Sequence, residues 1–164
     1  MPLFQNHCTT FIGNSAPFNQ NLHAIEYDIE EHVSLLQAIM MQESGGKGND
    51  PMQASESGYN TKFSRVPNGI TEPEYSIDVG THTFSDCVKK ANVKDLSDTE
   101  HIYLALQEYN YESGYIDWTI SNFGGYSKYN AQHFSDMKKQ ELNVSEYGDP
   151  SYVDHVMRYV GITF

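Results

Sequence analysis

Apolar residues recur every three or four positions between residues 21 and 43, which is the spacing of one face of an α-helix. The stripe consists of Leu22, Ile25, Ile29, Val33, Leu36, Ile39 and Met40. Its length fits one amphipathic helix or two short helices in tandem. Gly45 and Gly46 follow directly, and because glycine commonly ends a helix, we expect the helical segment to stop there.

The chain downstream of residue 73 carries further helical patterns. The segments are 73–91, 97–111, 113–123, 131–142 and 150–159. Ser97 and Glu100 stand three positions apart at the start of the second, which is the spacing of a capping box. Residues 46–73 are rich in Gly, Asn, Ser and Pro without a clear period, and loops of that length are usually functional or disordered. The sequence therefore predicts a mainly α-helical domain with a cleft walled by loops.

The length of 164 residues fits a single domain with its own hydrophobic core. We expect residues 1–17 to form an irregular lead-in, because Gly13, Asn14, Ser15 and Pro17 interrupt any regular pattern. The folded domain is then expected to span residues 18–164.

The charge balance argues against one class of partner. Ten Lys and Arg residues against 22 Asp and Glu residues give a formal net charge of −12. Nucleic-acid binding needs a basic patch, so we expect no nucleic-acid partner. The N-terminal segment lacks a basic stretch followed by an apolar one, and no window approaches the roughly 18 apolar residues of a membrane span. We therefore expect neither a signal peptide nor a membrane segment in this sequence.

The aromatic residues, cysteines and histidines give weaker indications of function than the charge does. Twelve Tyr and eight Phe residues fit either an aromatic core or stacking against a polar ligand such as a carbohydrate. Cys8 and Cys87 could form one disulfide or none, and we expect free thiols. The seven histidines show no HExxH motif and no paired ligand spacing, so no metal site and no cofactor is predicted.

Glu43 is the most informative single residue. Met40 follows Leu36 by four positions and Glu43 follows Met40 by three, which places Glu43 on the apolar stripe of its helix. Burial raises the pKa of a carboxyl group, and a carboxylic acid that stays protonated near neutral pH is what a glycosidase uses to protonate its leaving group. The alternative is that Glu43 only ends the helix and points to water.

Asp50 follows seven positions later, after a glycine-rich turn that could bring a second carboxylate across a cleft from Glu43. Two carboxyl groups roughly 6.5 to 9.5 Å apart fit an inverting glycosidase, and roughly 5 to 5.5 Å fits a retaining one. The sequence does not choose between them. Residues 49–51 could equally form an Asx turn without chemistry.

Three stretches, IMMQESGGKGNDPMQASES at 39–57, YSIDVGTHTF at 75–84 and LQEYNYESGYIDW at 106–118, carry a family resemblance. Together they resemble the lysozyme-like domain of CwlT-type cell-wall hydrolases of phages and conjugative transposons, related to goose-type lysozymes and soluble lytic transglycosylases. The resemblance runs over roughly residues 21–160. It implies a helical lysozyme-like fold that cleaves the bond between N-acetylmuramic acid and N-acetylglucosamine without a cofactor.

The resemblance also implies roles for individual residues. Glu43 corresponds to the catalytic acid and Asp50 to the second carboxylate, which positions or activates water. The implied substrate-binding residues are Ser44, whose hydroxyl could also tie the loop, with Met52, Gln53, Tyr109 and Asn110. One departure is Glu112, which stands where relatives have glycine. It would raise the pKa of Glu43 or repel an acidic glycan if it lies near the cleft, and it would do nothing if it points outward.

The leading hypothesis is a muramidase that acts on the glycan strands of bacterial peptidoglycan, at the cell wall. A lytic transglycosylase that forms 1,6-anhydromuramic ends is the first alternative. A wall-binding phage tail component without catalysis is the second. We expect that a peptidase or cell-wall-binding module could be fused to the domain or assembled with it.

Overall fold

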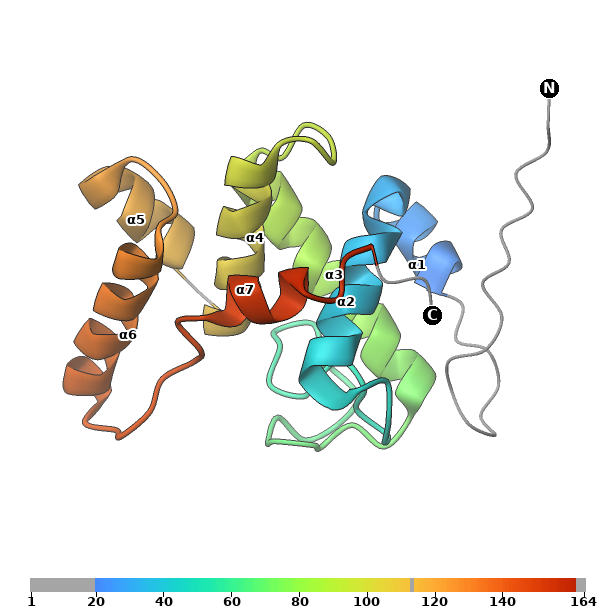
Figure 1. Ribbon diagram of the computed structural model, residues 1–164. Coiled ribbons are helices and arrows are strands. Elements are labelled where there is room, and N and C mark those ends of the chain that lie inside the picture. Colours follow the sequence, from blue (N-terminus) through green and yellow to red (C-terminus); the bar gives the residue numbers. More distant parts are fainter. Residues whose placement is uncertain (1–19, 113, 162–164) are drawn as a thin grey trace, which may run out of the picture.

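The computed structural model describes residues 20–112 and 114–161, and these ranges contain helices but no β-strand. The elements are α1 (Gln20–Glu26), the 3-10 helix η1 (Glu30–His32), α2 (Val33–Ser44), α3 (Pro73–Ala91), α4 (Thr99–Tyr111), α5 (Tyr115–Phe123), α6 (Lys128–Leu142) and α7 (Tyr152–Met157), and Figure 1 shows their arrangement. The predicted mainly α-helical class is confirmed. The predicted lead-in, residues 1–17, lies outside the described residues, as does Cys8.

The predicted helical segment before Gly45 is two helices with a break. α1 ends at Glu26, and Asp28 adopts a positive φ of 59° where the chain turns. Ile29 is buried immediately after the turn and fixes the start of η1 and α2. The apolar stripe holds in α2, where Leu36 and Ile39 are fully buried. It fails in α1, where Leu22 and Ile25 are more than half exposed.

The middle helices follow the predicted boundaries within two residues. Pro73 occupies the first position of α3, where its missing N–H leaves no helical hydrogen bond unmade. The predicted capping box at the start of α4 is wrong, because the Ser97 hydroxyl donates to Asp95 in a local turn and does not cap the helix. α6 begins earlier than predicted, because Ser127 caps it by accepting a hydrogen bond from the Asn130 N–H at 3.1 Å. α7 is shorter than predicted.

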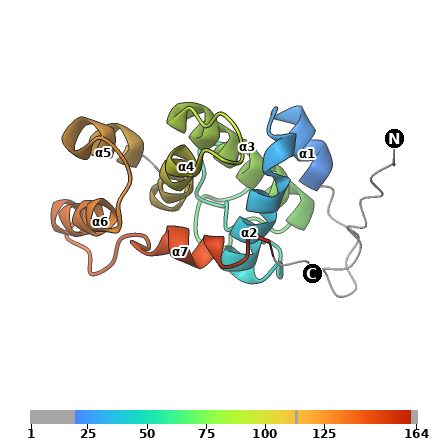
Figure 2. The same ribbon diagram turned by 45° about the horizontal axis from the view of Figure 1, so that its top comes forward.

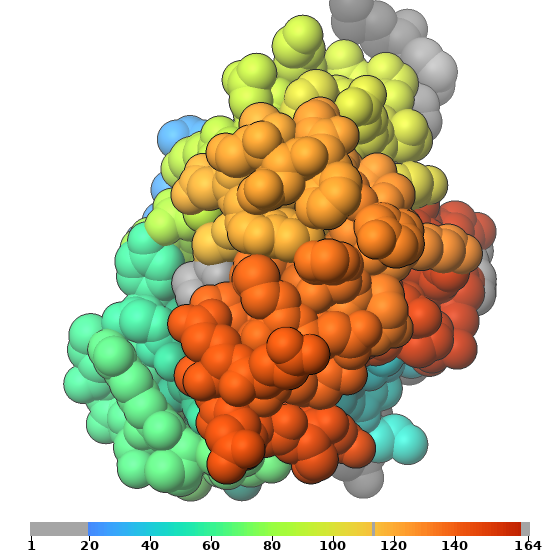
Figure 3. Space-filling model, turned by 90° about the vertical axis from the view of Figure 1, so that its left-hand side faces the viewer, coloured from blue at the N-terminus to red at the C-terminus, as the bar shows by residue number. Residues whose placement is uncertain are grey.

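α3 and α4 pack along each other at the centre of the molecule, and α1 and α2 lie on one side of this pair (Figures 1 and 2). α7 crosses from α4 to α2 and contacts both. α5 and α6 form the opposite end, and the space-filling view in Figure 3 faces them. The largest buried side chains come from several helices, which makes one continuous core: Leu36, Ile77, Phe84, Leu106 and Tyr152.

The segment between α2 and α3 carries no helix and folds back beneath the ends of both (Figure 1). It starts at Gly45, directly after α2, and returns to α3 through Ile70, which is buried. None of the helices in the described part of the chain is long and apolar enough to cross a membrane.

Candidate active site

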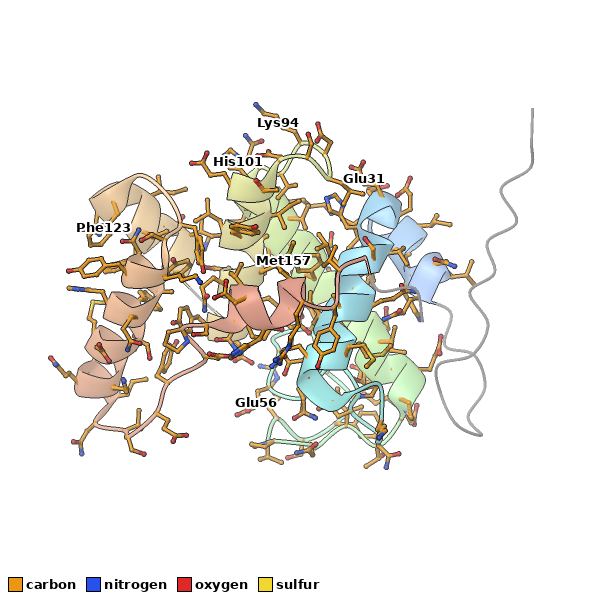
Figure 4. The ribbon with its side chains drawn as sticks, in the orientation of Figure 1. Glu31, Glu56, Lys94, His101, Phe123 and Met157 are labelled. Carbon is orange, nitrogen blue, oxygen red and sulfur yellow. The ribbon has the colours of Figure 1, made fainter. Side chains whose placement is uncertain are left out.

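A cavity of about 530 Å³ opens between the end of α2, the loop before α3, and the helices α3 and α4. Five of the site residues predicted from the sequence line this cavity: Glu43, Gln53, Tyr109, Asn110 and Glu112. The loop contributes further lining residues, among them Glu56, which is labelled in Figure 4. The cavity is the loop-walled cleft that the sequence predicts.

Glu43 lies in the last turn of α2, where the helix ends in a left-handed residue. Gly45 adopts a φ of 65°, and its N–H and that of Gly46 return to the carbonyls of Met41 and Met40. This glycine ending lets the chain leave sharply into the loop, because only glycine takes that conformation without steric cost. The side chain of Glu43 is therefore held at the junction of helix and loop, half buried and facing the cavity.

Tyr152 of α7 donates its hydroxyl hydrogen to Oε1 of Glu43 at 2.5 Å. The Tyr152 side chain is buried, and burial raises its pKa well above the usual value, so the phenol stays a donor. Sequence analysis missed this residue, because it stands 109 positions from Glu43 and no local motif marks it. The sequence predicted the helix of Tyr152 without giving it a function.

Burial is the main cause that raises the pKa of Glu43, and the hydrogen bond from Tyr152 opposes it. The negative charges of Asp50, Asp149 and Glu112 raise the pKa further. Desolvation and like charges both disfavour the ionised carboxylate. Glu43 is thus held toward its protonated form, as a general acid for a glycosidic oxygen requires.

Asp50 does not line the cavity. Its side chain is buried, and both carboxylate oxygens accept hydrogen bonds from inside the protein. Oδ1 accepts from the Ala54 N–H at 2.9 Å and the Ser76 hydroxyl at 2.6 Å, and Oδ2 accepts from the N–H and hydroxyl of Ser55. A carboxylate offers about four acceptor sites, so these donors fill Asp50. The structure gives it no atom with which to orient a water in the cavity.

Two more predicted contact residues turn inward. Met52 is fully buried against Gly80 of α3, where an added Cβ would lie 2.6 Å from the Met52 Cβ. The Met52 side chain therefore packs against α3 and does not line the cavity, and the predicted sugar contact stays a prediction. The Ser44 hydroxyl donates to the Pro51 carbonyl at 2.8 Å and accepts from the Lys47 N–H, so it ties the loop to α2 and does not line the cavity.

Gln53 and Tyr109 line the cavity, and hydrogen bonds to other protein groups fix their side chains. The amide nitrogen of Gln53 donates to the Asp50 carbonyl and to the Asn68 side chain, both at 2.9 Å, which leaves its carbonyl oxygen to accept. The Tyr109 hydroxyl donates to the Met52 carbonyl at 3.0 Å, so its ring, rather than its hydroxyl, is presented to the cavity.

Asn110 joins the cavity wall to α7. Its side-chain oxygen accepts a hydrogen bond from the Asp149 N–H at 2.6 Å, just before the helix that carries Tyr152. Gln107 of the same helix, α4, donates to the Asp149 carbonyl at 3.0 Å. These two bonds fix the approach to α7 and thereby position the tyrosine that holds Glu43.

Glu112 ends α4 in a left-handed conformation with a φ of 61° and lines the cavity. Its carboxylate has no hydrogen bond or ion pair with any described residue. The residue is exposed, and partial desolvation of its carboxyl group raises its pKa, as does the charge of Glu56, which lines the same cavity. Of the two interpretations of Glu112, the structure supports the one in which it lies near the cleft and raises the pKa of Glu43.

These helices, with a carboxyl group at the end of α2 facing a loop-walled cavity, define a class of protein. A family model described as lysozyme-like matches residues 19–159, and the chain belongs to this family.

The chain is also similar to individual known proteins. The chain is 42% identical over 138 residues to the bifunctional muramidase/DL-endopeptidase CwlT of Bacillus subtilis, covering 84% of this chain and 38% of that protein. It is 32% identical over 100 residues to a pneumococcal vaccine antigen A homolog of Streptococcus pyogenes, covering 61% of this chain and 45% of that one. A Staphylococcus aureus structure described as similar to lipoprotein of the NLP/P60 family superposes with a TM-score of 0.73 at 30% identity, over 88% of this chain and 50% of that chain. The chain therefore spans half or less of these relatives.

Proposed function

We propose that this domain is a peptidoglycan hydrolase of the muramidase type, with Glu43 as its general acid. The observation that carries the proposal is the half-buried Glu43 carboxyl, which faces the cavity with a raised pKa and a hydrogen bond to Tyr152. The similarity to a relative described as a muramidase supports the choice of substrate.

In the proposed reaction, Glu43 donates its proton to the oxygen of the bond between N-acetylmuramic acid and N-acetylglucosamine. As the bond between this oxygen and the anomeric carbon breaks, the carbon develops positive charge, because the transition state resembles an oxocarbenium ion. A water molecule from the solvent then adds to the anomeric carbon and releases its proton, which gives the reducing end. The carboxylates that raise the pKa of Glu43, including Asp50 and Asp149, also make the site electrostatically favourable for that charge. We assign Asp50 this electrostatic role and the task of holding the loop, in place of the expected water contact.

Substrate contacts are proposed for the groups that line the cavity. The free carbonyl oxygen of Gln53 is suited to accept a hydrogen bond from an N-acetyl N–H, and the ring of Tyr109 offers an apolar surface to a sugar face. Asn110 and Glu112 complete this side of the groove.

One observation favours a second reaction at the same site. Because the acceptor sites of Asp50 are filled, the structure gives it no means of activating a water. A lytic transglycosylase needs no water: a hydroxyl of the muramic acid itself attacks, and Glu43 acts first as acid and then as base. The product is then a 1,6-anhydro sugar.

Product analysis tests the proposal. Purified Gram-positive peptidoglycan is digested with the protein, and the released muropeptides are weighed by mass spectrometry before and after borohydride reduction. Muramic acid at reducible ends is the result expected of a muramidase. Anhydro ends, lighter by one water and resistant to borohydride, would establish the transglycosylase. Binding to the wall without release of fragments would overturn both and favour the non-catalytic wall-binding component.

A second module is also proposed. The chain covers 38% of a relative described as both muramidase and endopeptidase, which is compatible with a peptidase in the same assembly. The proposed place of action is the bacterial cell wall.

A further inference from the structure

A cluster of possible metal ligands lies on α1 and α3, outside the groove. Nδ1 of His23 and carboxylate oxygens of Glu26 and Asp78 all lie within 4.8 Å of one another. The His23 nitrogen is 3.3 Å from Oδ1 of Asp78 and 3.9 Å from Oε2 of Glu26. The two helices pack side by side in Figures 1 and 2, which brings together residues more than 50 positions apart.

The tautomer with which His23 would bind a metal ion is set by its other nitrogen. Nε2 lies 3.0 Å from Oε1 of Glu74, and because an ionised carboxylate only accepts hydrogen bonds, Nε2 is the donor. In the neutral imidazole Nδ1 then carries a lone pair. This atom is buried and makes no hydrogen bond, even to the nearby Asp78 oxygen. In that tautomer a nitrogen lone pair and two carboxylates face one another, and a cation bound between them would be attracted by all three.

Further groups hold the cluster in place. Glu74 orients the His23 ring through the bond to Nε2. The Tyr27 hydroxyl donates to Oδ1 of Asp78 at 2.6 Å. Metal ligands in proteins are usually fixed by hydrogen bonds to outer carboxylates and hydroxyls. A ligating histidine commonly donates the N–H of its other ring nitrogen to a carboxylate.

We propose that His23, Glu26 and Asp78 form a binding site for a divalent transition-metal ion of the Zn²⁺ type. One imidazole nitrogen with two carboxylate oxygens suits Zn²⁺, whereas Ca²⁺ and Mg²⁺ prefer oxygen ligands alone. Three protein ligands leave a position for water. No motif search of the sequence finds this set, because Asp78 stands 52 positions after Glu26 and only the fold joins them.

The site has a structural consequence for the groove. A metal ion there would bind α1 to α3 at the point where Tyr27 contacts Asp78. The Tyr27 ring stacks on His82 at 4.4 Å, and His82 stacks on Tyr59 at 3.5 Å between ring centroids. Tyr59 lines the cavity, so this stack connects the metal cluster to the cavity wall.

Calorimetry and thermal melting of the metal-free protein, prepared without a histidine tag, test the proposal. We expect ZnCl₂ to bind at one ion per chain and to raise the melting temperature, because a ligand that binds only the folded state stabilises it. CaCl₂ and MgCl₂ at the same concentration should do neither. His23→Ala should abolish the binding, and Glu74→Gln, which leaves the three ligands in place, should weaken it by roughly 10- to 100-fold.

His101→Ala is the matched control. His101, labelled in Figure 4, pairs with Asp98 at 2.7 Å but has no third ligand, so its loss should leave zinc binding unchanged. Circular dichroism and the digestion of peptidoglycan show whether each variant is folded, since none of these residues lines the groove. If the wild type shows no saturable zinc binding, or if His23→Ala and Asp78→Asn bind zinc as well as the wild type does, the proposal is wrong and the cluster is an ion pair of protonated His23.

Discussion

At the scale of single residues, the groups around Glu43 act on its pKa in opposite directions. Burial and the charges of Asp50, Asp149 and Glu112 raise it, while the hydrogen bond from Tyr152 lowers it. The proposed acid works only when protonated, so activity should fall as the pH rises through the pKa of Glu43. This fall is the alkaline limb of the activity profile. Each neighbour can be tested by replacing it and measuring whether the limb moves to higher or to lower pH.

Tyr152→Phe removes the hydroxyl that stabilises the Glu43 carboxylate. The pKa of Glu43 should rise, and the alkaline limb of the activity profile should move to higher pH. The maximal rate should fall roughly 10-fold, because the acid is no longer held in position. The measurement is the rate of peptidoglycan digestion across pH. A limb that stays in place would show that Tyr152 has no influence on the acid.

Glu112→Gln should move the same limb to lower pH. It removes a negative charge that raises the pKa of Glu43, so the carboxyl loses its proton at lower pH. Glu56→Gln is the matched control, because Glu56 lines the same cavity but is not among the main influences on Glu43. Equal shifts in both variants would contradict a specific action of Glu112.

Sequence reasoning at this scale could place a residue where its position depends on one local pattern. The apolar stripe and the glycine ending placed Glu43 at the cavity, while its catalytic role rests on the family resemblance and stays a proposal. Tyr152 could not be predicted, because only the packing of α7 on α2 brings it to Glu43. The inward turn of Met52 was equally hidden, since it depends on the close approach permitted by Gly80.

At the scale of elements, the loop between α2 and α3 is ordered by hydrogen bonds to a buried carboxylate. Asp50 accepts from Ala54 and Ser55 within the loop and from Ser76 of α3. The Ser55 hydroxyl also accepts from the Ile70 N–H at 2.9 Å, which joins the first half of the loop to the residues just before α3. This segment lacks periodicity because polar contacts, rather than an apolar face, hold it.

Asp50→Asn should therefore destabilise the protein and also lower its rate of peptidoglycan digestion. Asparagine turns its amide hydrogens toward groups that are themselves donors, which leaves buried polar groups unpaired. We expect a loss of about 1–3 kcal/mol in the free energy of unfolding, measured with urea. Asn68→Gly is the control, since it removes a loop contact of Gln53 at the surface and glycine adopts the positive φ of 57° at this position without steric cost. An unchanged stability in Asp50→Asn would contradict the role of Asp50 as the anchor of the loop.

Helix positions were largely predictable, because the apolar period and the end signals are local. Helix ends were less so. Ser97 has the right spacing for a cap, but Asp98 occupies the N-cap position of α4, and the Ser97 hydroxyl donates to Asp95 in the preceding turn. The start of α6 depends on Ser127, whose hydroxyl accepts from the third residue after it, a cap that the apolar pattern alone does not reveal.

At the scale of the whole molecule, the net charge of −12 opposes binding to an anionic wall. The rate of digestion should rise between about 0.01 M and 0.15 M salt, because the screening length falls from about 30 Å to about 8 Å. Peptidoglycan stripped of teichoic acids should show a smaller rise. A rate that falls steadily with added salt would mean that local positive charge guides the encounter.

The measurement that tests the central claim most directly is the digestion rate of Glu43→Gln against that of Glu56→Gln at the pH optimum. We predict a loss of roughly 10²- to 10⁴-fold for Glu43→Gln and little change for Glu56→Gln. At neutral pH the melting temperature of Glu43→Gln should equal or exceed that of the wild type, because the raised pKa means that ionised Glu43 opposes folding. A folded Glu43→Gln variant that digests peptidoglycan as fast as the control would contradict the account.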